Sequence, residues 1–285
     1  MKAGLKPFSL GSALAQVRDQ LQTITDTPGL DAQVLIAHIY QKDKSWVLAH
    51  PEYNLSADQS AQLNHSLDEL LKGTPLPYIL GYWEFFGHRF RVTPDVLIPR
   101  PETELLVETA YHWLKSHPER RWAAETGVGS GCISISLAIA VPDLRISATD
   151  ISPMALDLAG ENAQQYGVEQ QISLLEDDLL AHQAGRFDLI IANLPYIPTA
   201  SLHNLPVYQR EPTLALDGGE DGLDLINRLL AQSVDKIEAG GLILLEIESG
   251  QGNSAPALAK RYYPQGCVQV KSDLSGLPRL LAVQI

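Results

Sequence analysis

From residue 121 onward, short strand-like runs alternate with helix-like segments. The strand-like runs are residues 121–125, 145–150, 171–177, 187–193 and 241–247. The helix-like segments between them are residues 132–140, 153–167 and 221–237. This alternation predicts a doubly wound, mostly parallel sheet, with residues 268–274 and 279–285 as candidates for a closing antiparallel pair. Ligands of such sheets bind beyond the carboxyl ends of the strands, so we expect the chemistry in the loops there.

The first 73 residues lack this alternation and predict a small helical bundle. Apolar residues lie on one helix face at positions 10, 14, 17, 21 and 24. We expect Asp31 to cap a second helix. Ser56 and Gln59 have the spacing of a capping box for a further helix, which Gly73 would end. Because residues 1–73 contain no catalytic constellation, we interpret them as a substrate-recognition domain.

The sequence pattern of residues 74–95 predicts a connector built around a β-hairpin. Aromatic and β-branched residues flank Gly87 and His88, where we place the turn. Residues 96–285 form the third region, and Pro101 stands in the first turn of its first helix. The predicted fold class is therefore α/β, with a helical bundle and a hairpin connector ahead of the larger domain.

Negative charge is concentrated in the large domain. The chain has 21 Lys and Arg against 34 Asp and Glu, a net charge of −13. Residues 121–285 alone carry 10 basic and 20 acidic side chains, a net −10. This balance disfavours binding to nucleic acid through a basic surface and adhesion to an anionic membrane. It suits a cationic or small neutral ligand.

The cysteine count and hydropathy set further limits. Cys132 and Cys267 are too few for a disulfide-rich scaffold or a multi-thiolate metal site, and we expect no metal cofactor. No apolar run reaches transmembrane length, and the N-terminus lacks the apolar core of a signal peptide. We therefore expect a cytoplasmic protein that binds no membrane. As a separate expectation, we take it to be a monomer.

The first two predicted strand ends point to an adenosine-containing ligand. Gly127, Gly129 and Gly131 form a GxGxG turn between a strand and a helix, which allows close approach of the backbone to a ligand. Asp150 ends the second strand, where a carboxylate can accept hydrogen bonds from both ribose hydroxyls. The acidic pair at 177–178 ends the third strand, where it can meet the adenine amino group.

The most specific feature is the sequence Asn193-Leu194-Pro195-Tyr196 after the fourth predicted strand. Transfer to a planar NH2 group needs such residues. The Asn193 side-chain carbonyl and the Leu194 backbone carbonyl can each accept one hydrogen of the NH2 group. Tyr196 can stack on its plane, so that the nitrogen lone pair faces an electrophilic methyl group.

In this order, the three motifs resemble those of class I S-adenosylmethionine-dependent methyltransferases. A longer match resembles one family, the N(5)-glutamine methyltransferases of peptide chain release factors (PrmC, also called HemK). The matching segments are residues 77–81, 85–87, 97–104, 127–131, 150, 193–197 and 211–212. The sequence departs from the family pattern at Leu194, where proline is usual, and at Glu125, where aspartate is usual.

The resemblance implies a Rossmann-like domain with a seven-stranded, mostly parallel sheet, S-adenosylmethionine as the cofactor, and methylation of the glutamine in the Gly-Gly-Gln loop of class-I release factors. It implies that the cofactor is bound by Gly127, Val128, Gly129, Ser130, Gly131, Asp150, Asp178, Leu179 and Asn193. It also implies that the catalytic glutamine pocket is formed by Asn193, Leu194, Pro195 and Tyr196. We expect Arg100 to contact the protein substrate or to organise the site beside Glu102.

Other functions share this chemistry. An adenine-N6 methyltransferase acting on RNA or DNA would hold a flipped base in the same pocket, although the acidic domain disfavours it. A glutamine methyltransferase for a ribosomal protein would have the same active-site residues. A cofactor-binding adaptor without catalysis would not need Asn193, and the presence of Asn193 argues against that function.

Overall fold

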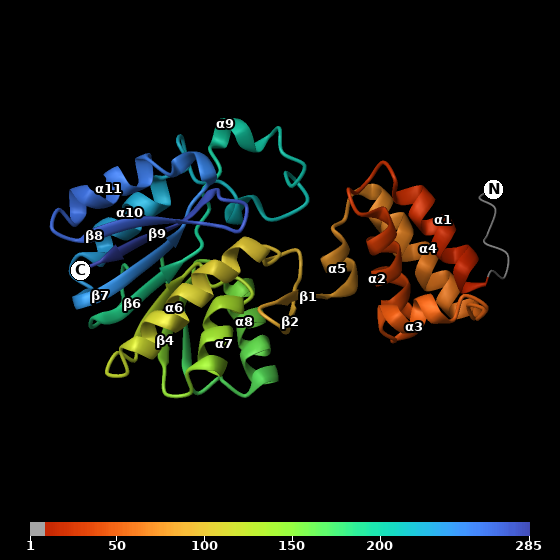
Figure 1. Ribbon diagram of the computed structural model, residues 1–285, viewed down its shortest axis with the longest axis horizontal. Helices are drawn as coiled ribbons and strands as arrows, with labels where there is room; N and C mark the ends of the chain where they lie inside the picture. The colour runs from red at the N-terminus through yellow and green to blue at the C-terminus, as the bar shows by residue number, and fades with distance from the viewer. Residues whose placement is uncertain (1–8) are drawn as a thin grey trace. The chain divides into compact units, whose positions relative to one another are not determined.

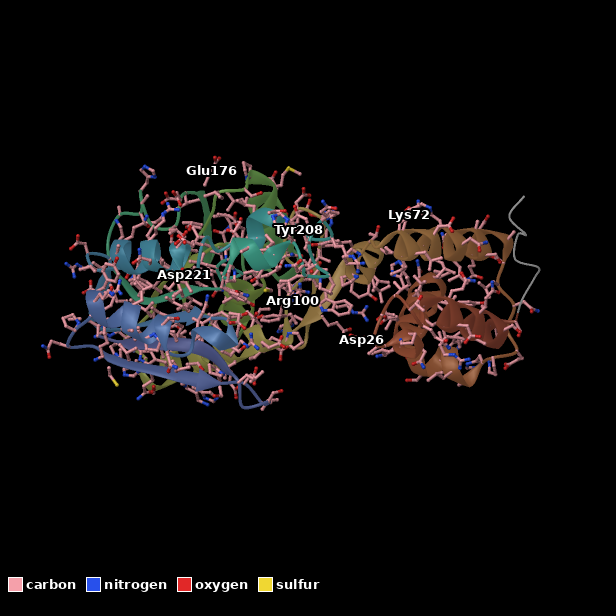
Figure 2. All side chains as sticks on the ribbon, turned by 90° about the horizontal axis from the view of Figure 1, so that it is seen from above. Asp26, Lys72, Arg100, Glu176, Tyr208 and Asp221 are labelled. Atoms are coloured by element: carbon pink, nitrogen blue, oxygen red, sulfur yellow. The ribbon has the colours of Figure 1, made fainter. Side chains whose placement is uncertain are left out.

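The computed structural model describes residues 9–285 and divides into two compact units, Met1–Gly81 and Tyr82–Ile285. Figure 1 shows the helices of the first unit in red to orange and the sheet of the second in yellow-green to blue. In Figure 2, Asp26 and Lys72 belong to the helical unit and Arg100, Glu176, Tyr208 and Asp221 to the α/β unit. No helix in residues 9–285 combines the length and apolarity needed to cross a membrane.

The first unit is helical, as predicted. Its helices are α1 (Leu10–Leu21), α2 (Pro28–Tyr40), α3 (Lys44–Ala49), α4 (Ala57–Lys72) and α5 (Leu76–Leu80). The capping box of α4 is confirmed: Ser56 Oγ accepts from the Gln59 N–H at 3.1 Å, and Gln59 Oε1 accepts from the Ser56 N–H at 2.9 Å. Gly73 ends this helix in the left-handed conformation at φ 100°.

Two details of the helical prediction are wrong. Helix α1 ends at Leu21, so Ile24 lies beyond it and is exposed. Helix α2 begins at Pro28, and Asp31 therefore lies inside its first turn instead of capping it. The fixed φ of proline suits the first helical position, which moves the start of the helix ahead of the carboxylate.

The second unit is α/β. Its strands are β1 (Tyr82–Phe85), β2 (His88–Arg91), β3 (Trp122–Thr126), β4 (Arg145–Asp150), β5 (Ile172–Glu176), β6 (Phe187–Ala192), β7 (Ile237–Glu246), β8 (Cys267–Ser272) and β9 (Pro278–Gln284). Its helices are α6 (Glu104–Ser116), α7 (Cys132–Ala140), α8 (Pro153–Tyr166), α9 (Thr199–Leu202), α10 (Asp224–Ser233) and α11 (Ser254–Tyr262). Short 3-10 turns occur at η1 (Pro101–Thr103), η2 (Thr213–Ala215) and η3 (Ser249–Gln251).

The large sheet has seven strands in the order β5-β4-β3-β6-β7-β9-β8. Strands β3 to β7 pair in parallel, and β9 pairs antiparallel with both β7 and β8. The predicted parallel sheet and its closing antiparallel pair are therefore confirmed. Helices α6, α7 and α8 cover one face and α10 and α11 the other, so the unit has three layers (Figure 1). The strand order reverses between β3 and β6, which places a ligand crevice there.

The hairpin belongs to the α/β unit. Phe85 and Phe90 are buried in the core on the α7 face. Asn162 of α8 fastens β2, because it accepts from the Arg91 N–H at 2.9 Å and donates to the Arg91 carbonyl at 3.0 Å. The turn residues are Phe86 and Gly87, both with positive φ. The turn lies one residue earlier than expected, since a two-residue turn of this kind needs positive φ at both positions and His88 starts β2.

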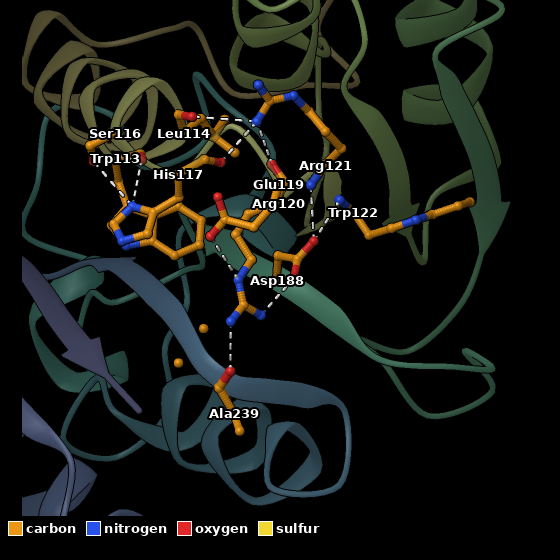
Figure 3. A network of polar contacts seen from close by, with 12 residues as sticks. Trp113, Leu114, Ser116, His117, Glu119, Arg120, Arg121, Trp122, Asp188 and Ala239 are labelled. Carbon is orange, nitrogen blue, oxygen red and sulfur yellow. Dashed lines mark hydrogen bonds and ion pairs between the residues drawn. The ribbon is translucent and has the colours of Figure 1, made fainter.

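One buried carboxylate binds groups at the amino-terminal ends of the central strands. Asp188 in β6 accepts from the N–H groups of Arg121 and Trp122 at 2.9 and 3.0 Å. It also accepts from Arg120 Nη1 at 3.0 Å, and the same guanidinium donates to the Ala239 carbonyl (Figure 3). This network joins the amino-terminal ends of β3, β6 and β7, which lie at the opposite end of these strands from the ligand crevice.

Candidate active site

A cavity of about 870 Å³ opens at the carboxyl ends of the parallel strands. Its walls come from the loops after β3, β4, β5 and β6, together with residues of 95–103 and 199–228. The acidic residues among the described lining residues are the buried Glu125 and six aspartates: Asp95, Asp150, Asp177, Asp178, Asp217 and Asp224. Arg228 is the one basic residue among them. The cavity therefore favours a ligand that carries positive charge.

The loop after β3 has the conformation that its glycines predict. Gly127, Gly129 and Gly131 have φ of 71°, 53° and 79°. A Cβ at Gly131 would lie 2.9 Å from Ile135 Cδ1, so this glycine permits close helix packing. A Cβ at Gly129 would meet nothing within 4 Å, so here the bare backbone borders the open cavity. Such a cradle suits a ligand that packs directly on the main chain.

Asp150 lies at the end of β4 and lines the cavity. Its Oδ2 accepts from the Gly129 N–H and its Oδ1 from the Ser152 N–H, both at 3.0 Å. Ser152, not Asp150, caps α8, since Ser152 Oγ accepts from the Ala155 N–H. The carboxylate is thus fixed against the glycine loop and keeps lone pairs for a ligand hydroxyl.

Glu125 at the end of β3 is buried, and its pKa is raised to about 8, mainly by loss of solvation. Its Oε2 accepts from the Ser134 N–H at 2.9 Å and from the Ser134 hydroxyl. Its Oε1 is buried and has no partner. The longer carboxylate at this position therefore packs beneath the cavity and binds the first turn of α7.

The loop after β5 lines the cavity with Asp177, Asp178 and Leu179. Asp177 is buried, and although burial raises its pKa, hydrogen bonds with the His182 ring and the His182 main-chain N–H hold that pKa below the usual range. Asp178 forms an ion pair with Arg228 of α10. Leu179 has a φ of 60°, and its carbonyl accepts from Thr149 Oγ1 at 2.8 Å. Asp178 and Leu179 thus line the cavity on a loop that is held by contacts to α10 and β4.

A second cavity of about 130 Å³ adjoins the first. It is lined by Leu97, Arg100, Asn193, Leu194, Pro195, Tyr196, Ile197, Val207, Ala215 and Leu216. Asn193, Leu194 and Pro195 line both cavities. The smaller cavity has the location expected of an acceptor pocket, with Asn193 at the shared wall.

The Asn193–Tyr196 segment is held by contacts that sequence analysis missed. Asn193 Nδ2 donates to Thr103 Oγ1 at 3.0 Å, and the Tyr196 hydroxyl donates to Glu246 Oε1 at 3.1 Å. Burial raises the pKa of Tyr196, and the neighbouring Glu246 adds to this effect. The buried Leu194 side chain packs against the glycine loop, with Cδ2 3.2 Å from where a Gly127 Cβ would stand.

Two signals for these partners were present in the sequence. Thr103 belongs to the segment of residues 97–104, and Glu246 stands at the carboxyl end of a predicted strand, where functional groups gather. Arg100 lines the smaller cavity, and its partner is Glu211, with Arg100 Nη2 2.5 Å from Glu211 Oε1. Glu102, the partner suggested by the sequence, forms no side-chain hydrogen bond with Arg100 in the described contacts.

The strand order, the glycine loop after β3 and the acidic rim define a methyltransferase of the class I fold. A crystal structure of a ribosomal protein L11 methylase from Lactobacillus delbrueckii subsp. bulgaricus shares this fold, with a TM-score of 0.50 and 21% identity over 71% of this chain and 89% of that one. Residues 101–207 match the family profile described as the methyltransferase small domain, and residues 12–81 match the PrmC N-terminal domain.

Curated relatives match most of the chain. A release factor glutamine methyltransferase of Moorella thermoacetica is 41% identical over 256 residues, 89% of this chain and 90% of the relative. One of Coxiella burnetii is 35% identical over 282 residues, 97% and 99% of the two chains. The chain belongs to the family of release factor glutamine methyltransferases.

Proposed function

We propose that this protein transfers a methyl group from S-adenosylmethionine to the side-chain amide nitrogen of the Gly-Gly-Gln glutamine in class-I peptide chain release factors. It would act as a monomer in the cytoplasm and serve translation termination. The observation that carries the proposal is the pair of adjoining cavities that share Asn193. The family membership of the chain supports the substrate class.

The larger cavity fits the cofactor. The open space above Gly129 leaves room for a ligand on the bare backbone, and the carboxylate lining suits a cation. Asp150 would accept from the ribose hydroxyls, and Asp178 with Leu179 would border the adenine. Gly127, Val128, Ser130 and Gly131 would complete the wall with Asn193. When bound, S-adenosylmethionine supplies an electrophilic methyl group on a positively charged sulfur.

The residues of the smaller cavity would hold the acceptor amide. Asn193 Nδ2 already donates to Thr103, which leaves Asn193 Oδ1 to accept one hydrogen of the substrate NH2 group. The Leu194 backbone carbonyl would accept the other, and the Tyr196 ring would pack on the amide plane. Placement of this kind lowers the barrier by roughly 7–11 kcal/mol in well-oriented systems. Acceptors aimed at the NH2 group also strengthen as positive charge develops there.

Arg100 and the helical unit would serve substrate recognition. Arg100 lines the smaller cavity with about one third of its side chain exposed, 32%. Its charge is already paired with Glu211, so it would shape the rim instead of neutralising a substrate carboxylate. The unit Met1–Gly81 would select the protein to be modified, as the match of residues 12–81 to the PrmC N-terminal domain supports.

The test is a comparison of acceptors. The protein is incubated with S-adenosylmethionine carrying a labelled methyl group and, separately, with a release factor, ribosomal proteins or ribosomal RNA. We expect label in the release factor and none when its loop glutamine is replaced by glutamate. Label in a ribosomal protein or in RNA, with none in the release factor, would overturn the proposal in favour of one of the other acceptors.

A further inference from the structure

Tyr196 is held both by its main chain and by its hydroxyl. The Tyr196 hydroxyl donates to Glu246 Oε1 at 3.1 Å, and the Tyr196 carbonyl accepts from Gln251 Nε2 at 3.2 Å. Glu246 is the last residue of β7 and Gln251 the last residue of η3, and both are buried. Because β7 pairs with β6, these two residues reach the segment that follows β6. The aromatic residue that lines the smaller cavity is therefore fixed from the neighbouring strand.

The orientation of the Gln251 amide is set by its neighbours. Its Oε1 accepts from the Glu248 N–H at 3.0 Å, so its NH2 group must face the other way. There the NH2 group donates to the Gly222 carbonyl at 3.1 Å and to the Tyr196 carbonyl at 3.2 Å, and the Asp221 carbonyl lies at 3.4 Å. Both ends of the amide thus have partners within the protein. Gln251 ties the main chain of Tyr196 to the loop that contains Gly222.

This loop, between η2 and α10, packs directly on the main chain of the Asn193–Tyr196 segment. A Cβ at Gly218 would lie 2.7 Å from the Pro195 carbonyl oxygen and 2.7 Å from Tyr196 Cα. A Cβ at Gly222 would overlap the Tyr196 carbonyl oxygen. Gly218 lies outside the left-handed region, so the close approach alone requires a glycine there. The loop and the segment therefore fit each other only in this arrangement.

We propose that Gln251 is a positioning residue that holds the Tyr196 ring against the acceptor amide. Gln251 fixes the Tyr196 carbonyl, and Glu246 fixes the Tyr196 hydroxyl. Gly218 and Gly222 allow the main chain to pack closely beside them. This inference rests on the proposed function, which places the Tyr196 ring on the plane of the acceptor amide. Gln251 lies outside the described lining of both cavities, so its effect on transfer must pass through the residues that it binds.

Two points of attachment matter because a methyl acceptor needs accurate placement. In well-oriented systems, a displacement of about 1 Å at the reacting groups lowers the rate about a hundredfold. A hydrogen bond to the Tyr196 hydroxyl alone would leave the main chain of this residue free to shift. A hydrogen bond to the carbonyl alone would leave the ring free to rotate. With both bonds in place, the ring keeps its position before the substrate arrives.

The first experiment observes the Tyr196 phenol without substrate or cofactor. Burial raises the pKa of Tyr196, and the neighbouring Glu246 adds to this effect. The charges of Arg279 and Arg100 oppose it. The full chain is labelled with 3-fluorotyrosine, and the ¹⁹F resonance of Tyr196 is assigned by its loss in Tyr196→Phe. In the wild type, Tyr196 should stay neutral at a pH where exposed fluorotyrosines ionise. In Gln251→Met, which has nearly the same volume but donates no hydrogen bond, Tyr196 should ionise at least about one pH unit lower than in the wild type.

The second experiment measures methyl transfer to the release factor. We expect kcat to fall at least about tenfold in Gln251→Met, with little change in the dissociation constant for S-adenosylhomocysteine. Gln284→Met is the matched control, because Gln284 also bridges two main-chain carbonyls, those of Gly240 and Gly241, at 2.9 and 3.0 Å. Gln284 lies toward the amino-terminal ends of the central strands. Its replacement should lower the free energy of unfolding to a similar extent and leave both kcat and the Tyr196 titration unchanged.

A pair of glycine variants tests the same segment independently. Gly218→Ala adds a Cβ close to Tyr196 Cα without backbone strain, so kcat and the pKa of Tyr196 should both fall. Gly160→Ala in α8 is the matched control, since its Cβ would lie 3.5 Å from Leu174 Cδ1, which is an ordinary contact. This control should transfer methyl groups as the wild type does. The glycine comparison also decides the matter if Gln251→Met does not fold.

Two results would overturn the inference. One is a Tyr196 titration in Gln251→Met that matches the wild type. The other is an equal fall in kcat in Gln251→Met and Gln284→Met, because it would show a general effect of lost stability. If the wild-type protein methylated no release factor, the proposed function would fail instead. The titration would still decide whether Gln251 holds Tyr196, because it needs no substrate.

Discussion

Arg100 Nη2 lies 2.5 Å from Glu211 Oε1, although 111 positions separate the two residues. The Glu211 carboxylate is buried, and its Oε2 also accepts from the Ile98 N–H at 3.1 Å. Glu211 thus binds the segment before α6 both through a side chain and through the main chain. Because Leu97 and Arg100 line the smaller cavity, this pairing supports the wall of that cavity.

Removal of the arginine should destabilise the fold through its partner. In Arg100→Met the Glu211 carboxylate stays buried without its counter-ion, which costs about 1–3 kcal/mol. The free energy of unfolding from urea titration measures the loss. Adding Glu211→Gln to this variant should recover part of it, since a neutral amide is easier to bury. Equal stability of Arg100→Met and the wild-type protein would contradict this, because it would show that the Glu211 charge does not depend on Arg100 for its stabilisation.

Substitution of Asp150 should weaken cofactor binding specifically. Asp150→Asn keeps the shape but removes the charge of the carboxylate that we propose to bind the ribose, and a charge-assisted hydrogen bond of this kind contributes about 1.5–3 kcal/mol. We expect the dissociation constant for S-adenosylmethionine, measured by calorimetry, to rise more than about tenfold. Asp143→Asn is the control, because Asp143 is an exposed partner of Arg121 outside the cavity lining. Unchanged affinity in Asp150→Asn would refute the ribose role.

Glu125 should make stability depend on pH. Its folded pKa of about 8 lies above the ordinary value of 4.5, so the folded state binds a proton more tightly than the unfolded state. Stability contributed by this proton is present below pH 4.5 and is lost as pH rises toward 8. Glu125→Gln keeps an acceptor for Ser134 and removes the titration. Its melting temperature should exceed that of the wild type by a margin that grows from pH 5 to 8, and a constant margin would contradict this account.

The Asp188 network should affect stability without affecting chemistry. Asp188→Ala removes the carboxylate that accepts from two backbone N–H groups and from the Arg120 guanidinium at the amino-terminal ends of the strands (Figure 3). We expect a loss of about 3 kcal/mol in the free energy of unfolding. At a temperature where the variant remains folded, kcat should equal that of the wild type. A fall in kcat without a loss of stability would show that this network influences the distant site.

Local signals in the sequence were sufficient for most elements of the fold. The capping box of Ser56 and Gln59 and the strand–helix alternation depend on neighbours in the chain, and both were predicted. The start of α2 was predicted too late. Both Thr27–Pro28 and Asp31 are residue types that favour a helix start, and the local sequence does not select between them. The hairpin turn was predicted one residue too late, because Phe86 adopts a left-handed backbone conformation that is rare for residues other than glycine.

The candidate site was predictable in its motifs but not in its pairings. The loops containing Gly129, Asp150 and Asn193 follow strand ends, and the topology of the sheet brings them to one cavity. The partners of Arg100 and Asn193 could not be predicted, since those contacts join segments 111 and 90 positions apart. Nothing in the local sequence of Glu246 or Thr103 specifies which polar group each one meets.

The most direct test of the central claim is to locate the transferred methyl group. A purified class-I release factor is incubated with S-adenosylmethionine and either the wild-type protein or Asn193→Ala, and the loop peptide is fragmented by mass spectrometry. The account predicts one methyl group on the side-chain amide nitrogen of the Gly-Gly-Gln glutamine with the wild type, and none with Asn193→Ala although that variant still binds the cofactor. A methyl group on any other residue, or near-normal transfer by Asn193→Ala, would contradict it.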